Sequence, residues 1–308
     1  MTRLTTVWHE EYEVDLGEHV YPTEKYRLVR RELEEEAVLP DLRLVSPEPA
    51  QPADLARVHT ESYLEKVRSG SFTRQDELRL EVPFSAGLRR AMLLACGGTT
   101  LAARRALEEG VAVHLGGGFH HAFPDHGEGF CLLNDSAVAL RALQADGRIR
   151  RAAVVDCDVH QGNGTAEIFR DDPSVFTLSL HQERLYPARK PPSDLDVGLP
   201  DGIGDEAYLD RLEEALPRAL EQPEPDLALY LAGADPYRRD QLGGLGLTLE
   251  GLRRRDRTVL RSLRRRGIPA VVLLAGGYAV RVEDTVSIHV GTVREALETL
   301  REEAARAG

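Results

Sequence analysis

Five compact apolar segments recur along the chain, each five or six residues long. They are residues 111–115 (VAVHL), 152–156 (AAVVD), 175–180 (VFTLSL), 227–232 (LALYLA) and 270–275 (AVVLLA). Their apolar positions are nearly continuous rather than alternating with polar ones, which is typical of strands buried on both faces of a parallel sheet. We therefore predict that all five segments are core strands.

Longer segments with apolar residues at helical spacing lie between and around these strands. They are residues 23–37, 87–109, 134–146, 206–221, 248–266 and 282–306. Thr23 and Thr248 are the expected starts of two of these helices. Strands that alternate with helices predict an α/β fold built on one doubly wound sheet. Because no linker-like segment divides the chain, residues 1–308 are expected to form a single domain.

Polar and glycine-rich residues follow each of the five predicted strands. GGGFHHAF follows the first strand and CDVHQGNG the second. The third strand ends in SLHQE, the fourth in GADPYRRD and the fifth in GGYA. In open parallel sheets, ligands bind beyond the carboxyl ends of the strands. The sequence therefore predicts a functional site at this edge of the sheet.

Two aspartates and a histidine alternate at the end of the second strand. Asp156, Asp158 and His160 share one face if the extended backbone continues as far as residue 160. Asp235 follows the fourth strand, and carboxylates with an imidazole suit zinc or another borderline divalent ion. Three ligands leave coordination positions open, as in catalytic sites. The alternative is that these residues form turns and cap helices.

Two histidines and a tyrosine follow other strands of the predicted sheet. His120 and His121 come after three glycines, which let the backbone approach a ligand closely. Neutral histidines carry protons well at neutral pH, although either residue could instead be a metal ligand. The hydroxyl of Tyr278 could donate to a developing oxyanion. Gly129 and Phe130 could wall a channel, and core packing is the alternative for Phe130.

Composition and charge exclude some classes of function. The chain has 308 residues, of which 42% are hydrophobic, and a net charge of −12 with a pI near 5.4. This balance argues against binding to nucleic acid or anionic membranes. The sequence has neither an apolar run of membrane-spanning length nor a signal-peptide core. Its three cysteines do not suggest a disulfide framework, so we expect a cytoplasmic protein.

The motifs GGGFHHAF, GFCLLND, VDCDVHQGNGT, TLSLH, AGADP and GGY, in this order, resemble the zinc-dependent histone deacetylases and their bacterial relatives. The resemblance runs from about residue 10 to 295. The segments YPTEKYRLVRREL, HQGNG and DQLGGLGLT are most similar to the class IV branch. The resemblance implies the arginase/deacetylase fold, an α/β architecture with a largely parallel eight-stranded sheet flanked by helices on both sides.

The resemblance also implies a role for each matched residue. One zinc ion per chain would be held by Asp158, His160 and Asp235. The proton-transfer and carbonyl-polarising groups would be His120, His121 and Tyr278, with Asp156 orienting His120. A structural potassium ion would be held by Asp156, Ser179, Leu180 and the backbones of Asp158 and His160. Backbone carbonyls of some members hold a second potassium ion at positions that match Phe169, Asp172 and Val175. The substrate channel would be lined by Phe119, Gly129, Phe130, Tyr186 and Leu242.

Three positions depart from the family pattern. Asn163 stands where class I enzymes have an aspartate paired with the second histidine, which alters the charge near His121. Phe119 replaces the tryptophan that precedes the two histidines in many members. The acidic residue that holds the substrate backbone at the rim of the channel has only Glu77 and Glu81 as candidates.

The sequence therefore predicts a zinc-dependent amidohydrolase that removes an acyl group, with acetyl preferred, from the side-chain amine of acyl-lysine in proteins or peptides. The alternatives are a long-chain fatty acyl-lysine deacylase and a deacetylase of acetylated polyamines or another small amine. An arginase-like enzyme with two metals and a catalytically inactive acyl-lysine reader are further alternatives. We expect no nucleic-acid or membrane partner, and the oligomeric state stays open.

Overall fold

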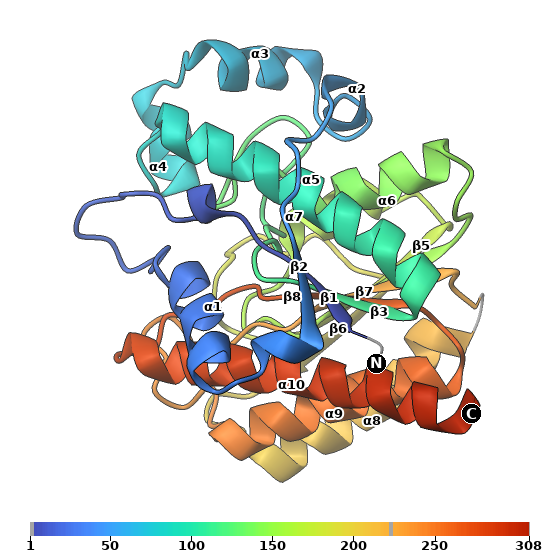
Figure 1. The fold of residues 1–308 in the computed structure, drawn as a ribbon. Coiled ribbons are helices and arrows are strands. Elements are labelled where there is room, and N and C mark those ends of the chain that lie inside the picture. Colours follow the sequence, from blue (N-terminus) through green and yellow to red (C-terminus); the bar gives the residue numbers. More distant parts are fainter. Residues whose placement is uncertain (1–2, 222–223, 308) are drawn as a thin grey trace.

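Eight strands form one sheet in the computed structural model, which describes residues 3–221 and 224–307 (Figure 1). The strands are β1 (Leu4–Val7), β2 (Leu42–Val45), β3 (Val111–His114), β4 (Ala152–Asp156), β5 (Val175–Gln182), β6 (Leu195–Leu199), β7 (Leu227–Leu231) and β8 (Ala270–Leu273). Their order is β2-β1-β3-β8-β7-β4-β5-β6, and every neighbouring pair is parallel. The predicted α/β architecture is confirmed, with a sheet that is parallel throughout.

Helices cover both faces of this sheet. They are α1 (Lys25–Glu35), α2 (Pro52–Leu55), α3 (Glu61–Ser69), α4 (Arg74–Leu80), α5 (Ala86–Glu109), α6 (Asp135–Ala145), α7 (Asn163–Phe169), α8 (Asp205–Glu221), α9 (Leu249–Arg265) and α10 (Val282–Ala307), with 3₁₀ turns η1 (Glu10–Tyr12) and η2 (Leu39–Asp41). In Figure 1, α8, α9 and α10 lie below the sheet, and α5 and α6 lie above it. The short helices α2 and α3 lie beyond α5, and α4 lies near the amino-terminal end of α5.

The hydrophobic core has two halves, one on each face of the sheet. Along β8, Ala270 and Val272 pack into the half that contains residues of α8, α9 and α10. Val271 and Leu273, which alternate with them, pack into the half that contains residues of α5 and α6. Successive side chains of a strand point to opposite faces, so a strand covered on both sides must be apolar at every position. This requirement explains the continuous apolar runs in the sequence.

Three strands were not predicted from the hydrophobic pattern. β1 (LTTV) is fully buried, but two threonines interrupt its apolar run, and Thr5 donates a hydrogen bond to Glu109. β2 (LRLV) and β6 (LDVGL) are the edge strands, where exposure permits the polar residues Arg43 and Asp196. The four unpredicted helices, α2, α3, α4 and α7, have nine residues or fewer.

The two predicted helix starts have different outcomes. Thr248 caps α9 as expected, because its hydroxyl oxygen accepts a hydrogen bond from the Gly251 backbone N–H at 3.0 Å. The prediction for Thr23 is wrong: α1 begins two residues later, and the Thr23 hydroxyl instead donates to the Val14 carbonyl at 2.6 Å. Thr23 therefore ties the preceding loop together.

Two further findings concern the chain as a whole. None of the helices in residues 3–221 and 224–307 is both long and apolar enough to cross a membrane. Cys96, Cys131 and Cys157 are free thiols, and all three are buried.

Candidate active site

Four neighbouring strands in the middle of the sheet end at one place. The sheet order places β3, β8, β7 and β4 side by side. The loops that follow these strands carry, in that order, His120 with His121, Tyr278, Asp235, and Asp158 with His160. Residues that are far apart in the sequence therefore meet at the carboxyl edge of the sheet, as the parallel pattern predicts.

The three predicted metal ligands form a compact buried group. One potential ligand atom from each of Asp158, His160 and Asp235 lies within 4.8 Å of those of the other two. His160 Nδ1 is 3.0 Å from Asp158 Oδ1 and 3.4 Å from Asp235 Oδ2. The expected extended backbone does not reach residue 160, because β4 ends at Asp156 and the chain then bends. It is this bend that turns Asp158 and His160 toward Asp235.

The geometry around Asp235 fits a divalent cation. Asp235 Oδ1 accepts a hydrogen bond from the Val159 N–H at 2.9 Å, but the buried Oδ2 has no hydrogen-bond partner. A Cβ at Gly276 would lie 2.0 Å from this oxygen, so glycine keeps the space beside it clear. A buried anionic oxygen without a partner is costly unless a cation neutralises it. Two carboxylates and an imidazole are a donor set that zinc accepts.

The pKa values of Asp235 and His160 also indicate that the three-residue group attracts positive charge. Burial and the neighbouring Asp158 raise the pKa of Asp235 to about 7. Burial lowers the pKa of His160, but its contacts with Asp158 and Asp235 outweigh burial and raise that pKa to about 10. In the metal-free protein, the charge of Asp158 therefore favours a proton on His160 and also raises the proton affinity of Asp235.

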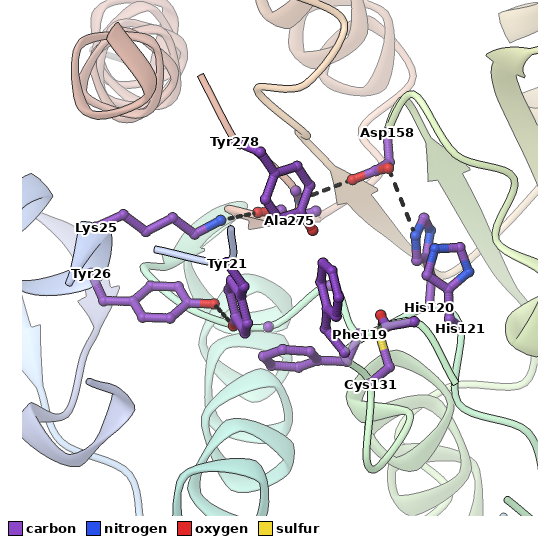
Figure 2. Close-up of a pocket in the computed structure, with 15 residues that line it drawn as sticks. Tyr21, Lys25, Tyr26, Phe119, His120, His121, Cys131, Asp158, Ala275 and Tyr278 are labelled. Atoms are coloured by element: carbon purple, nitrogen blue, oxygen red, sulfur yellow. Dashed lines mark hydrogen bonds and ion pairs between the residues drawn. The ribbon is translucent and has the colours of Figure 1, made fainter. Parts of the chain in front are cut away.

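His120 and His121 lie side by side (Figure 2). Their electrostatic settings differ. Their ring centroids are 4.1 Å apart. His120 Nδ1 donates to Asp156 Oδ2 at 2.6 Å, whereas His121 Nδ1 lies 2.6 Å from Asn163 Oδ1. Burial lowers both pKa values, but Asp156 and Asp158 raise that of His120 to about 9. The pKa of His121 stays well below its ordinary value because of burial and the neighbouring His120.

A buried carboxylate holds the loop that carries these histidines. Asp135 accepts hydrogen bonds from the backbone N–H groups of Gly118 (3.0 Å) and Phe119 (2.8 Å), and from the Thr99 hydroxyl. Gly118 has φ +82°, and a Cβ there would lie 2.6 Å from that of Ala275. The glycine is required both for the left-handed turn and for the close packing against the segment that follows β8.

Tyr278 presents a neutral hydroxyl to the site. Its backbone N–H donates to Asp240 Oδ2 at 2.7 Å, and Gln241 Nε2 donates to its carbonyl at 2.9 Å. Burial and the carboxylates of Asp158 and Asp235 raise its pKa well above the ordinary value, so the phenol keeps its proton at neutral pH. A protonated hydroxyl beside the ligand group is a hydrogen-bond donor for an oxyanion.

A cavity of about 430 Å³ leads to the site from the surface, and its lining is mainly apolar. Of the predicted channel residues, it is lined by Gly129, Phe130, Tyr186 and Leu242. Glu81, one of the two candidates for the rim acid, also lines this channel, whereas Glu77 is exposed on α4. Phe119, the fifth predicted channel residue, lies elsewhere.

Phe119 instead lines a small inner cavity of about 20 Å³ (Figure 2). Lys25, Tyr21 and Tyr26 line the same cavity. Lys25 is fully buried, its ammonium donates to the Ala275 carbonyl at 2.6 Å, and burial lowers its pKa to about 8. Phe119 therefore faces the inner cavity and not the outer channel, and its role in binding substrate stays a prediction.

The residues predicted to hold a structural potassium ion lie on adjacent strands. Asp156 of β4 pairs with Ser179 of β5, and Leu180 follows Ser179. Asp156 Oδ1 also accepts from the Asp158 N–H at 3.1 Å, which joins this region to the ligand group. The potassium ion itself stays a prediction, as does the second one at Phe169, Asp172 and Val175.

The sequence interpretation missed Asp135 and two further residues that the structure places at the site. Glu128 accepts hydrogen bonds from Asn163 Nδ2 at 2.6 Å and from the Tyr186 hydroxyl at 3.2 Å. In the sequence, Glu128 could have been noticed as a charged residue between two glycines, near the predicted channel residue Phe130. Lys25 is one of only three lysines in the chain, and its position among aromatic residues was the available signal.

Comparisons with known proteins agree with this arrangement. The family model described as "Histone deacetylase domain" matches residues 19–293. An uncharacterized protein of Picosynechococcus sp. is 43% identical over 92% of this chain and 95% of its own length. Histone deacetylase 2 of Arabidopsis thaliana is 32% identical over 90% of this chain and 75% of its own length. The crystal structure of the HDA15 HD domain superposes with a TM-score of 0.78 at 25% identity, covering 97% of this chain and 90% of that one.

An eight-stranded parallel sheet with buried histidines and carboxylates at its carboxyl edge defines the class of the protein as an α/β protein with the arginase/deacetylase fold. The chain belongs to the histone deacetylase family. Family membership supports a deacetylase or amidohydrolase activity.

Proposed function

We propose that this protein is a zinc-dependent deacetylase that removes an acetyl group from the side-chain amine of acyl-lysine in peptides or proteins. The observation that carries the proposal is the buried group Asp158, His160 and Asp235, with its unpartnered Asp235 oxygen. This group lies beside a largely apolar channel whose lining includes His121 and Tyr278.

A single metal ion suits the donor groups of the structure. Within residues 3–221 and 224–307, Asp158, His160 and Asp235 are the one group of three or more acidic, histidine or cysteine residues close enough to bind a metal. An arginase-like site with two metals needs more carboxylates at the strand ends. Zinc held by these three side chains would polarise the substrate carbonyl and lower the pKa of water.

The chain's own residues supply proton transfer and charge stabilisation. A neutral imidazole takes the proton of the attacking water, and an imidazolium gives a proton to the departing amine. The two rings have different partners, because His120 Nδ1 is held by Asp156 and His121 Nδ1 lies against Asn163 Oδ1. Tyr278 donates its hydroxyl hydrogen to the oxyanion that develops on the carbonyl. Asp156 keeps the His120 ring in place through the 2.6 Å hydrogen bond.

The inner cavity supports a short acyl group. The centre of a water-sized sphere can occupy about 20 Å³ of this cavity. One water molecule needs about 10–15 Å³ measured in this way, so the cavity has room for one or two water-sized groups. The buried Lys25 ammonium and the Tyr21 and Tyr26 hydroxyls also line it. A long apolar chain would have to displace side chains and desolvate a cation there, so acetyl is favoured over a fatty acyl group.

The outer channel supports an extended amine such as a lysine side chain. Its walls are largely apolar, as the methylene groups of lysine require, and include Phe130, Leu185 and Leu242. Glu81 is the carboxylate in this lining and could accept from a substrate backbone N–H or attract a cationic amine. An acetylated polyamine is therefore the second candidate substrate.

A substrate comparison tests the proposal. The zinc-loaded protein is assayed with one peptide bearing acetyl-lysine or dodecanoyl-lysine, and with an acetylated polyamine. We expect the highest kcat/KM for acetyl-lysine, and no turnover in Asp235→Ala protein. Binding of the acetyl peptide without turnover by the intact protein would favour the reader alternative. A higher kcat/KM for the polyamine would transfer the proposal to small amines.

A further inference from the structure

Glu128 connects the second histidine of the site to the wall of the channel. Asn163 Nδ2 donates to Glu128 Oε1 at 2.6 Å, and the Tyr186 hydroxyl donates to the same oxygen at 3.2 Å. On the other side of the amide, Asn163 Oδ1 lies 2.6 Å from His121 Nδ1. His121, Asn163 and Glu128 therefore form one continuous chain of hydrogen bonds.

The chemistry of these groups fixes the direction of each hydrogen bond. An ionised carboxylate can only accept, so Asn163 must turn its NH₂ group to Glu128 and its oxygen to His121. The Gly164 N–H donates to the same oxygen at 3.0 Å and supports this orientation. Because the amide oxygen also only accepts, neutral His121 must carry its proton on Nδ1. The other ring nitrogen, Nε2, then keeps its lone pair.

Glu128 carries its charge at neutral pH. Burial raises its pKa, but hydrogen bonds from His126, Asn163 and Tyr186 outweigh burial and hold the pKa below its ordinary value. The Glu128 side chain is 19% exposed, so solvent screens its charge only in part. A negative charge that polarises the amide stabilises positive charge on the imidazole beyond it.

The backbone around Glu128 is built for close contact with the same groups. A Cβ at Gly129 would lie 2.7 Å from His121 Cδ2 and 3.0 Å from the Tyr186 hydroxyl. Only glycine lets the segment approach both rings, and its φ of +51° also favours glycine. Glu128 is therefore placed by a segment that packs directly against His121.

We propose that Glu128 is a positioning residue for His121: acting through Asn163, it fixes the imidazole tautomer and supplies the negative charge that an asparagine lacks. The inference rests on the proposed function, in which His121 transfers protons. Since the charge acts on the imidazolium and not on the substrate, its loss affects kcat more than KM.

Glu128→Gln is the first test, because it keeps the side-chain size and an acceptor oxygen but removes the charge. On an acetyl-lysine peptide we expect kcat to fall about tenfold, with KM within about twofold of the unaltered protein. The matched control is Glu167→Gln, which removes a carboxylate from the same surface cavity of about 590 Å³. Glu167 pairs with Arg170, and the control should leave both constants within about twofold.

A charge swap separates charge from packing. Adding Asn163→Asp to Glu128→Gln places a carboxylate directly on His121 and should restore most of kcat. Should Glu128→Gln not fold, Asn163→Asp alone is compared with the double variant. In Asn163→Asp protein the new carboxylate and Glu128 repel each other, whereas the double variant has only the new carboxylate, so we expect the double variant to be faster. Tyr186→Phe breaks the second contact of Glu128, and an equal loss of kcat there would assign the effect to the channel wall and overturn the proposal. An unchanged kcat in Glu128→Gln, or no recovery in the double variant, would also overturn it.

A measurement without substrate keeps this inference separate from the proposed function. The His121 Nδ1 proton lies in a 2.6 Å hydrogen bond and should resonate downfield in the NMR spectrum. Glu128→Gln should move this resonance upfield, and Glu167→Gln should not. The shift tests the role of Glu128 even if the protein hydrolyses none of the acyl substrates, and an unmoved resonance counts against it.

Discussion

Replacement of Phe119 by alanine should change which acyl groups the protein accepts. Phe119, Tyr21, Tyr26 and Gly117 line both the inner cavity of about 20 Å³ and an adjacent, mainly apolar cavity of about 10 Å³. These shared residues form the partition between the two spaces. Phe119 contributes a large apolar side chain that is 8% exposed, so its removal should join the two cavities.

The expected magnitude follows from these volumes. A dodecanoyl group has about ten more methylenes than acetyl, each worth about 0.8 kcal/mol when buried. The inner cavity holds only one or two water-sized groups. Forcing more atoms into a packed interior costs about 1–3 kcal/mol, equivalent to a kcat/KM about 5- to 150-fold lower than for acetyl-lysine. In Phe119→Ala protein, we expect this ratio to shift at least about tenfold toward the long chain.

The assay compares kcat/KM for acetyl-lysine and dodecanoyl-lysine in one peptide. Phe123→Ala is the matched control, since Phe123 is also buried but stacks on His126 and lines neither inner cavity. Phe119→Trp should lower any residual long-chain activity. A preference of about a hundredfold for the long chain in the unaltered protein, or an unchanged ratio in Phe119→Ala, would refute this account of the inner cavity.

Three further predictions concern the oxyanion donor, the metal and acid stability. Tyr278→Phe should keep metal and fold but lower kcat about 10²–10³-fold, and near-normal turnover would make Tyr278 only a wall of the channel. Elemental analysis after dialysis should find one zinc per chain, lost in Asp158→Ala or Asp235→Ala, whereas two equivalents would indicate an arginase-like site. Burial lowers the pKa of His59 to about 4 from an ordinary 6.5, so the unfolded chain binds a proton that the fold excludes. Stability should therefore fall by up to about 3 kcal/mol as the pH drops from 6.5 to 4, and urea unfolding should show a weaker pH dependence in His59→Gln.

The sequence predicts the strand ends that form the site because one physical rule covers them. The carboxyl ends of parallel strands meet at one edge, so Asp158, Asp235 and Tyr278 could be expected together without knowledge of any contact. This rule does not predict the positions of Asp135 and Glu128. Each acts through hydrogen bonds to one particular loop or side chain, and these partners become neighbours only when the loops have their final conformation.

Buried polar residues are a second kind of feature that the pattern of hydrophobic positions in the sequence does not predict. Thr5 interrupts the apolar run of β1, and its hydroxyl is satisfied by Glu109, more than 100 residues away. Lys25 would be expected on an exposed helix face, but its ammonium is satisfied by the Ala275 carbonyl. Burial of a polar group depends on a partner far away in the sequence, so local periodicity does not reveal it.

The order of the strands has a consequence for how the protein matures. The Val159 N–H bonds to Asp235 across 76 residues of sequence, and the Asp158 carboxylate accepts from the Gly276 N–H across 118 residues. During synthesis, a chain that has emerged only as far as β4 holds Asp158 and His160 but lacks the strands that complete the group. We therefore expect nascent or truncated chains to bind the metal ion poorly. Metal binding should then occur only after the sheet is complete.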